Sequence, residues 1–188
     1  MSTGPNRRLS VADYLAIENA AEFRSEYYDG EMFAMAGASI PHNRICMRLS
    51  IAVGIQLRGR KCEPLGSDQR VKIQRKGIFT YPDLLIVCGE IQTAPDDPMS
   101  ILNPTAIVEI ASPTTAGYDR GKKLRSYRLI PSLKEYVLIS QDDEFCESFY
   151  KLADGTWAHA VYEGLEETLE FRSVPVKVPL AELYAGAE

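Results

Sequence analysis

Residues 105–127 read TAIVEIASPTTAGYDRGKKLRSY, and this stretch joins a predicted buried strand to a predicted basic helix. The run Ala106–Ala111 carries apolar residues on both faces, with Glu109 as the exception. Removing a lone carboxylate from water is costly, so a buried acid has to be paired, hydrogen-bonded, protonated or bound to a metal. Glu109 therefore indicates either a structural polar network or a functional site.

A second acid has the same relation to an apolar run. Asp83 precedes Leu84–Val87 in a predicted strand over residues 79–88, with Pro82 near its start. Side chains alternate across a strand, so the two carboxylates converge if the strands pair with both acids on one face. Two hard oxygen ligands that leave room for water suit magnesium or manganese. The alternative is structural: Asp83 caps the turn after Pro82, and Glu109 bonds a buried Tyr or Arg.

The segment Tyr118–Leu129 predicts a helix that could complete such a site. Asp119 and Lys123 are four residues apart and share one face, whereas Lys122 points about 100° away. Two carboxylates, a divalent ion and a lysine can hydrolyse a phosphodiester, because the metal activates a water and the ammonium offsets developing charge. The alternatives are a simple i,i+4 ion pair and, for the cations from Arg120 to Arg128, a solvated helix face.

Length and composition indicate one globular domain. The chain has 188 residues, 45% hydrophobic and 25% charged, and we expect a single domain over residues 1–188, with residues 1–9 flexible. The apolar runs are too short to cross a membrane, and the first residues lack a signal-peptide pattern, so a cytoplasmic protein is expected. Two histidines are too few for a His-rich zinc site. The four cysteines are scattered and are expected to be reduced and buried: Cys46, Cys62, Cys88 and Cys146.

Charge is distributed unevenly along the chain. The net charge is −5, yet residues 1–134 hold 18 Lys and Arg against 14 Asp and Glu, and residues 135–188 hold 3 against 12. The acidic excess therefore belongs to a β-rich C-terminal part. The part that carries Glu109 is mildly basic, which is compatible with a nucleic-acid substrate.

Other elements follow from local signals. Ser10 begins a capping-box pattern before a short helix that should run to about Asn19. Asp29-Gly30 between apolar flanks predicts a tight hairpin turn, and a helix with Pro41 in its first turn follows. We also expect strands at DQRVKIQ, KEYVLIS, EFCESFY and TWAHAVY, a loop over residues 90–103, and a tail at residues 178–184 that packs back on the body.

Taken together, these segments resemble one known family. The stretches YPDLLIVC, NPTAIVEIASPTT and YDRGKKLRSYRLIPSLKEYVLIS, with EYYDGEMFAMAG, PHNRI and GSDQRVKI upstream, are similar to the Uma-type restriction endonuclease family of the PD-(D/E)XK nuclease superfamily. The likeness runs from about Ser10 to Tyr184. It implies a restriction-endonuclease-like α/β core, with a central mixed β-sheet flanked by helices and additional antiparallel C-terminal strands. It also implies that Asp83, Glu109 and the backbone carbonyl of Ile110 bind the metal.

The sequence departs from the superfamily at one position. The superfamily's lysine usually lies two residues after its glutamate on the same strand, where this chain has Ala111. We therefore expect Lys123 of the following helix to take that role, with Asp119 orienting it.

Four more polar residues are candidates for the same site. Glu26 is a third acid, since an N-terminal acid often joins the site in this superfamily; the alternative is an exposed cross-strand partner. His42, at a helix start, either contacts substrate or supports a ligand, or else is a neutral, hydrogen-bonded histidine. Ser112 bonds a phosphate or the glutamate, or simply caps a loop. Asp68 supports the site from behind, or is a turn acid.

The leading hypothesis is a Mg²⁺-dependent (or Mn²⁺-dependent) endonuclease acting on DNA, with Asp83, Glu109, Lys123 and Glu26 as catalytic residues. Nucleases of this kind often pair to cut two strands, so a homodimer is expected. Two alternatives stay open. One is a catalytically inactive interaction domain that dimerises through a sheet edge, and the other is a metal-dependent phosphodiesterase acting on RNA or on a small phosphoester.

Overall fold

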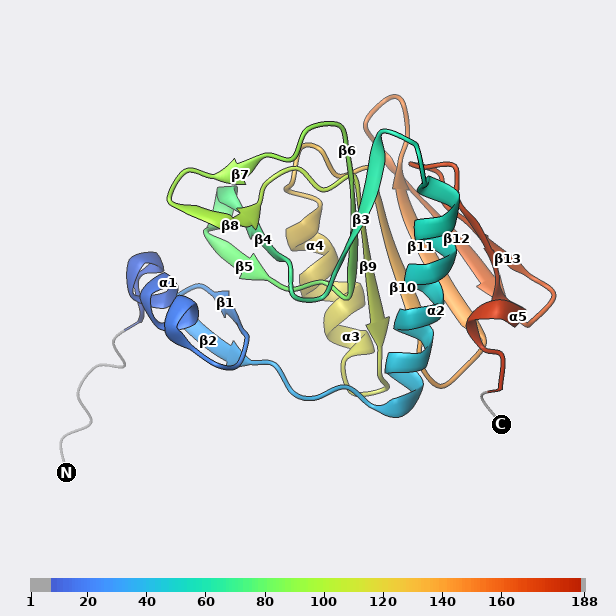
Figure 1. Ribbon diagram of the computed structural model, residues 1–188, viewed down its shortest axis with the longest axis horizontal. Coiled ribbons are helices and arrows are strands. Elements are labelled where there is room, and N and C mark those ends of the chain that lie inside the picture. Colours follow the sequence, from blue (N-terminus) through green and yellow to red (C-terminus); the bar gives the residue numbers. More distant parts are fainter. Residues whose placement is uncertain (1–7, 187–188) are drawn as a thin grey trace.

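The computed structural model describes residues 8–186, which form a mixed α/β fold built on two six-stranded sheets (Figure 1). The predicted α/β class is confirmed, but the strands are divided between two mixed sheets instead of one central sheet. Most of the predicted flexible segment 1–9 lies outside the described residues. Its last residue, Leu9, is tied to the first hairpin, because its N–H donates to the Gly30 carbonyl at 2.9 Å.

All strands of the first sheet precede β9 in the sequence. In spatial order its strands are β2 (Glu31–Ala34), β1 (Ser25–Tyr28), β5 (Ile78–Thr80), β4 (Arg70–Ile73), β8 (Asp97–Ile101) and β7 (Thr93–Ala94). β1 and β2 form the predicted hairpin, whose turn residues Asp29 and Gly30 both take positive φ, as a type I′ turn requires. Helix α1 (Val11–Ala20), with the predicted capping box at Ser10, packs on this sheet.

The second sheet holds the central strand of the protein. Its order is β12 (Trp157–Glu163), β11 (Phe145–Lys151), β10 (Glu135–Ser140), β9 (Ala106–Ala111), β6 (Leu84–Cys88) and β3 (Cys62–Gly66). β9 pairs parallel with β10 and antiparallel with β6, and all of its residues are buried. A strand covered at both edges and on both faces has a continuous apolar sequence, which accounts for the neighbours of Glu109.

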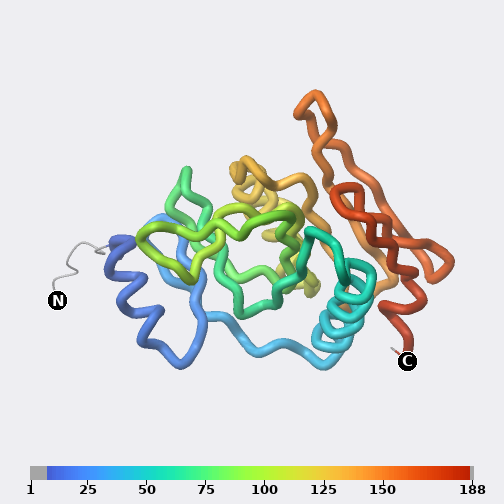
Figure 2. Tube along the Cα trace, turned by 45° about the horizontal axis from the view of Figure 1, so that its top comes forward, coloured from blue at the N-terminus to red at the C-terminus, as the bar shows by residue number. Residues whose placement is uncertain are grey.

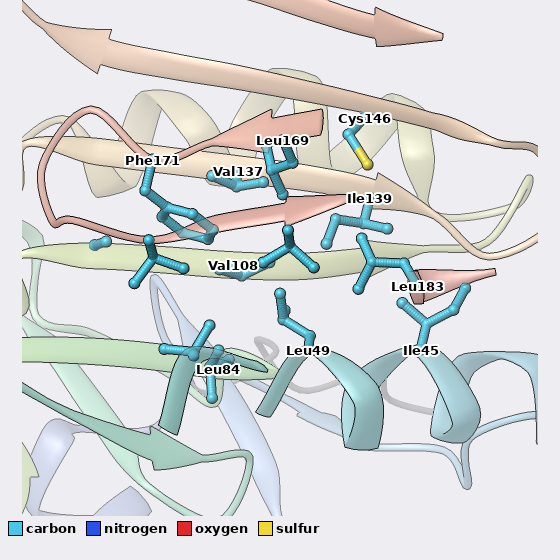
Figure 3. Close-up of a cluster of buried hydrophobic side chains, with 14 of the residues drawn as sticks. Ile45, Leu49, Leu84, Val108, Val137, Ile139, Cys146, Leu169, Phe171 and Leu183 are labelled. Carbon is cyan, nitrogen blue, oxygen red and sulfur yellow. The ribbon is translucent and has the colours of Figure 1, made fainter. Parts of the chain in front are cut away.

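Each face of the second sheet has its own core. One face packs against α2 (Ile40–Leu57), β13 (Thr168–Glu170), β14 (Lys177–Pro179) and α5 (Leu180–Leu183). Figure 3 shows side chains of this core, among them Leu49 of α2 and Val108 of β9. Leu183 of α5 joins them, so the predicted packing of the C-terminal tail is confirmed. The other face meets the first sheet and the helical segment that follows β9.

That helical segment includes an irregular turn. It consists of α3 (Ala116–Tyr118), a π-helical turn (Asp119–Lys123) and α4 (Leu124–Tyr127). Asp119, Lys123 and Tyr127 are all buried, so the face that they share does pack on the sheet. Single π-helical turns inside helices are frequent at functional sites.

The predicted strand over residues 79–88 is divided between the two sheets. Its first part is β5 and its second part is β6, and the chain crosses over at Tyr81, Pro82 and Asp83. Pro82 has no N–H to donate to a ladder, so the chain leaves the first sheet there. Asp83 thus lies at the junction of the sheets and not inside a strand.

The predicted loop over residues 90–103 is wrong, because it contains β7 and β8. β8 pairs parallel with β4. Its Asp97 is buried and paired with the buried Arg70, whose guanidinium lies 2.7 Å away. An acid and a proline make this run unlike a buried strand in the sequence, and the cation that compensates the acid, Arg70, is distant in the sequence.

The expectation of four reduced cysteines is wrong for Cys62 and Cys88, which form a disulfide. The two residues stand directly opposite each other on β3 and β6, where neighbouring chains are close enough for a bond. Cys46 and Cys146 are free. Because β3 was not predicted from sequence, nothing there indicated that Cys62 and Cys88 would meet.

Reducing this disulfide is expected to lower the free energy of unfolding by about 3 kcal/mol, because the bond joins residues separated by 26 positions. Chemical denaturation with and without a reducing agent measures the change. Thiol titration of the denatured, unreduced protein should find only the thiols of Cys46 and Cys146. Reactive thiols at all four positions would contradict the pairing.

Within residues 8–186, no helix is long and apolar enough to cross a membrane.

Candidate active site

A cleft of about 650 Å³ is lined by residues of both sheets and by the junction residue Asp83. Seven of the eight predicted side chains line it: Glu26, His42, Asp83, Glu109, Ser112, Asp119 and Lys123. They come from β1, α2, the β5–β6 junction, β9, the loop after β9 and the π-helical turn. The segment from β2 to α2, which runs along one side of the molecule in Figure 2, supplies further lining residues.

Asp83 and Glu109 meet on one face of the second sheet. β6 and β9 pair antiparallel with Leu84 opposite Val108, and the same register continued by one residue sets Asp83 opposite Glu109. The backbone N–H of Ile110 donates to Asp83 Oδ2 at 2.7 Å and fixes the carboxylate. The structure therefore brings together the two acids that the sequence singles out.

Glu109 is buried and is held by two side chains of the helical segment. Lys123 Nζ lies 2.9 Å from Glu109 Oε1. The Tyr127 hydroxyl donates to the same oxygen at 2.7 Å. Tyr127 lies four residues after Lys123, so both groups approach Glu109 from one helix face. Tyr127 is not among the residues predicted for the site; its spacing of four residues from Lys123, together with the expectation that a buried acid bonds a buried tyrosine, is the signal that could have found it.

The charges at this point are strongly coupled. Burial raises the pKa of Glu109 to about 8, and the charges of Asp83 and Glu26 act in the same direction, against the effect of Lys123. Burial also disfavours the Lys123 ammonium, but Glu109, Glu26 and Asp119 together hold the pKa of Lys123 well above its ordinary value. A buried ammonium group thus sits among several acids.

Glu26 and Asp119 are the other two acids around Lys123. Glu26 Oε1 lies 3.3 Å from Lys123 Nζ and accepts a hydrogen bond from the Tyr81 N–H at 3.3 Å. Asp119 Oδ1 lies 4.0 Å from the same nitrogen, and burial raises the pKa of Asp119. The ion pair between Asp119 and Lys123 is thus one of three that Lys123 makes with acids. It lies in the cleft and not on the solvated surface of the helix.

His42 contacts the other carboxylate oxygen of Asp83, the one that the Ile110 N–H does not reach. It stands in the first turn of α2, where its backbone N–H donates to the capping Ser39 side chain. Its Nε2 is 3.1 Å from Asp83 Oδ1, and this hydrogen bond raises the pKa of His42 in spite of its burial. The Nδ1 atom is buried without a hydrogen-bond partner among the described residues. His42 is therefore placed to orient Asp83.

The last two candidates differ from each other. Ser112 lines the cleft, but its hydroxyl is shared with Thr114 and Thr115 of the loop. Asp68 is not part of the site, because its side chain is 93% exposed in a turn beside Arg24. The prediction that it supports the site is wrong: the turn that precedes β4 points it into solvent.

The donors fit a hard divalent cation, although the described residues hold no preformed cluster of three His, Cys, Asp or Glu ligands. Asp83 and Glu109 supply carboxylate oxygens. The Ile110 N–H faces Asp83, and the carbonyl of a strand residue points toward the same strand edge as its N–H, so the Ile110 carbonyl is a third oxygen there. Two carboxylates and a carbonyl suit Mg²⁺, which usually keeps several of its waters.

The cations of the helical segment do not form one surface. Arg120 pairs with Glu147, and Arg128 lies over the Trp157 ring at 5.0 Å. Lys123 is inside the cleft, while Lys122 lies over the Tyr28 ring at 4.7 Å. The basic run is therefore neither a single solvated face nor a continuous nucleic-acid groove.

Comparison with known proteins places this chain in a nuclease-like class. A family model described as "Putative restriction endonuclease" (Uma2) matches residues 11–181, so the chain belongs to the Uma2 family. The family resemblance noted in the sequence is confirmed, and the function of the chain is nuclease-like.

Two relatives and one solved structure are similar over nearly the whole chain. The uncharacterized protein sll1609 of Synechocystis sp. is 34% identical over 91% of this chain and 97% of its own length. The uncharacterized protein slr1290 of the same organism is 33% identical over 98% and 95%. A crystal structure from Anabaena variabilis, described as "a putative nuclease belonging to DUF820", superposes with a TM-score of 0.77 at 14% identity, over 94% of this chain and 98% of that one. That likeness establishes the shared fold.

Proposed function

We propose that this protein is a Mg²⁺-dependent endonuclease that hydrolyses phosphodiester bonds in DNA. The observation that carries the proposal is the position of Asp83 opposite Glu109 in one cleft, with the Lys123 ammonium 2.9 Å from Glu109. An acid of β9 and an acid just before the neighbouring β6, with a lysine beside them, provide the groups that phosphodiester hydrolysis needs.

Asp83, Glu109 and the carbonyl of Ile110 would hold the ion. A bound Mg²⁺ supplies Lewis acidity to the phosphate and lowers the pKa of a water. Both the Lys123 and the Tyr127 contacts are made to Glu109 Oε1, so neither engages Oε2.

The protein's own groups prepare the reaction. Lys123 offsets the negative charge that develops on the phosphoryl oxygens as water attacks phosphorus and the leaving P–O bond breaks. Glu26 and Asp119 keep Lys123 charged and in place. His42 and the Ile110 N–H fix the two oxygens of Asp83, so the ligand is ordered before the cation arrives.

Metal removal tests the proposal. Purified protein is expected to cut labelled DNA in Mg²⁺, to lose that activity in EDTA, and to regain it with Mg²⁺ or Mn²⁺. Added Mg²⁺ should also raise the melting temperature, because an ion that binds only the folded protein stabilises it. The Glu109→Gln variant is the control and should show neither effect.

Equal cleavage in EDTA, or by Glu109→Gln, would contradict the proposal. A folded protein that cuts no nucleic acid and gains no stability from Mg²⁺ would support the inactive interaction domain. Parallel assays with RNA decide the remaining alternative, since an RNA nuclease would cut RNA in preference to DNA.

A further inference from the structure

An aromatic cluster with one cation lies at the rim of the cleft. We name Tyr28, Phe33, Tyr118 and Lys122 the rim cluster. Tyr28 of β1 is buried, and the rings of Phe33 and Tyr118 meet it edge-on, with centroid distances of 6.4 and 6.1 Å. Phe33 and Tyr118 are nevertheless 47% and 38% exposed, so each offers ring surface to solvent. Lys122 Nζ lies 4.7 Å from the Tyr28 centroid and 5.9 Å from that of Tyr118.

The rim cluster adjoins the candidate catalytic residues. Phe33 itself lines the cleft. Tyr118 directly precedes the cleft residue Asp119, and Lys122 directly precedes Lys123. Through Phe33, a group bound on the rim cluster lies beside the cleft that Asp83 and Glu109 line.

The interior of the cleft does not attract a polyanion by itself. Its acids are Glu26, Asp83, Glu109 and Asp119, against the single ammonium of Lys123. Affinity for a nucleic acid must then come from a bound metal and from the rim. Lys122 is the exposed cation of the helical segment that lies on the rim aromatics, because Arg120 and Arg128 are engaged with the β11–β12 face.

The combination of an acidic cleft interior with exposed rings at its rim points to a substrate class. A protein that grips duplex DNA through its backbone needs several aligned cations, one for each phosphate. Exposed aromatic rings beside a cation instead suit unpaired nucleotides, because a free base can stack on a ring while its phosphate meets the ammonium. A base within a duplex has both of its faces covered.

We propose that the rim cluster binds the base of an unpaired nucleotide beside the scissile phosphodiester, with Phe33 and Tyr118 stacking on bases and Lys122 contacting phosphate. The substrate of the cleft is then single-stranded or locally unpaired nucleic acid. This inference rests on the proposed function, whose substrate it specifies.

Binding measured apart from cleavage tests it. In the Glu109→Gln background, which is not expected to cleave, fluorescence anisotropy compares a labelled single-stranded oligodeoxynucleotide with its duplex. The single strand is expected to bind about tenfold more tightly, and Phe33→Ala or Tyr118→Ala should each weaken its binding about tenfold. Tyr118→Phe, which keeps the ring, should bind like the parent. Phe23→Ala is the matched control, since Phe23 is 76% exposed but does not line the cleft.

An abasic strand separates stacking from charge, because it keeps every phosphate. The parent should bind the abasic strand about as weakly as the Phe33→Ala variant binds the intact strand. The Phe33→Ala change should not weaken binding of the abasic strand any further. Duplex binding that equals or exceeds single-strand binding, no measurable single-strand binding, or unchanged affinity in both alanine variants would overturn the inference.

The two proposals can fail separately. Stacking-dependent binding by a wild-type protein that cleaves nothing would refute the proposed function and keep the inference. Metal-dependent cleavage of duplex DNA with no effect of the alanine variants would do the reverse.

Discussion

Replacing Lys123 by Met is expected to lower the free energy of unfolding by about 3–5 kcal/mol, the usual cost of removing one partner from a buried ion pair. Lys123 is the ammonium that Glu109, Glu26 and Asp119 share, at 2.9, 3.3 and 4.0 Å. Methionine fills a similar volume, so the loss reports charge more than packing. The same change should abolish cleavage, because the positive charge beside the phosphate is removed. Chemical denaturation in EDTA measures the stability effect without metal.

Lys122→Met is the matched control for stability. It removes the same charge from the next residue, but Lys122 is exposed, so a change within about 0.5 kcal/mol is expected. Equal destabilisation by the two variants would show that Lys123 does not hold the acids together.

The destabilisation of Lys123→Met should also depend on pH. Burial already raises the pKa of Glu109 in the folded protein to about 8, from an ordinary value of 4.5, and loss of Lys123 removes the effect that opposes this rise. The folded protein therefore holds a proton that the unfolded chain releases, and stability falls as pH rises from about 5 to 8. Below about pH 8 the parent and the variant lose stability in parallel, so the deficit of the variant should grow only above about pH 8, where Glu109 ionises beside Lys123 in the parent but keeps its proton in the variant.

Asp83→Asn is expected to slow Mg²⁺-dependent cleavage by more than about a thousandfold, equivalent to about 4 kcal/mol of transition-state stabilisation. Asparagine keeps the acceptor oxygen for the Ile110 N–H, so the fold should persist. The change removes the negative charge that attracts the cation to the site. Single-turnover cleavage rates measure the effect, and the loss of Mg²⁺-induced thermal stabilisation shows its cause.

His42→Gln provides a graded comparison with Asp83→Asn. Because His42 touches Asp83 and not the cation in the proposed arrangement, a loss of about 10- to 100-fold is expected. A larger loss for His42→Gln than for Asp83→Asn would place His42, and not Asp83, at the centre of the reaction.

The sequence predicts the site better than it predicts the sheets. Glu109 and Asp83 could be found because an acid in an apolar run is costly and therefore conspicuous. Lys123 followed from helical spacing, since four residues bring Asp119 and Lys123 to one face. Each of these signals is local, and the structure brings the three side chains to one cleft.

What could not be predicted depends on pairing between distant segments. The chain passes from the first sheet to the second at Pro82, and no local signal in the sequence indicates which sheet the next strand joins. Asp97 marks a buried strand only once Arg70 is known to lie beside it. Cys62 and Cys88 meet because β3 and β6 are neighbours, which their separate sequences do not reveal. The prediction that Asp68 supports the site was wrong for a different reason. An acid in an exposed turn is solvated and needs no partner.

The crossover at Pro82 has a consequence for the protein during synthesis. Glu26 belongs to the first sheet, Glu109 to the second, and Asp83 to the chain between them. Neither half of the fold contains a complete set of these groups, and Lys123 is added only after β9 has emerged. A nascent or partly unfolded chain thus has no assembled centre, so whatever chemistry the cleft performs is available only to a finished molecule.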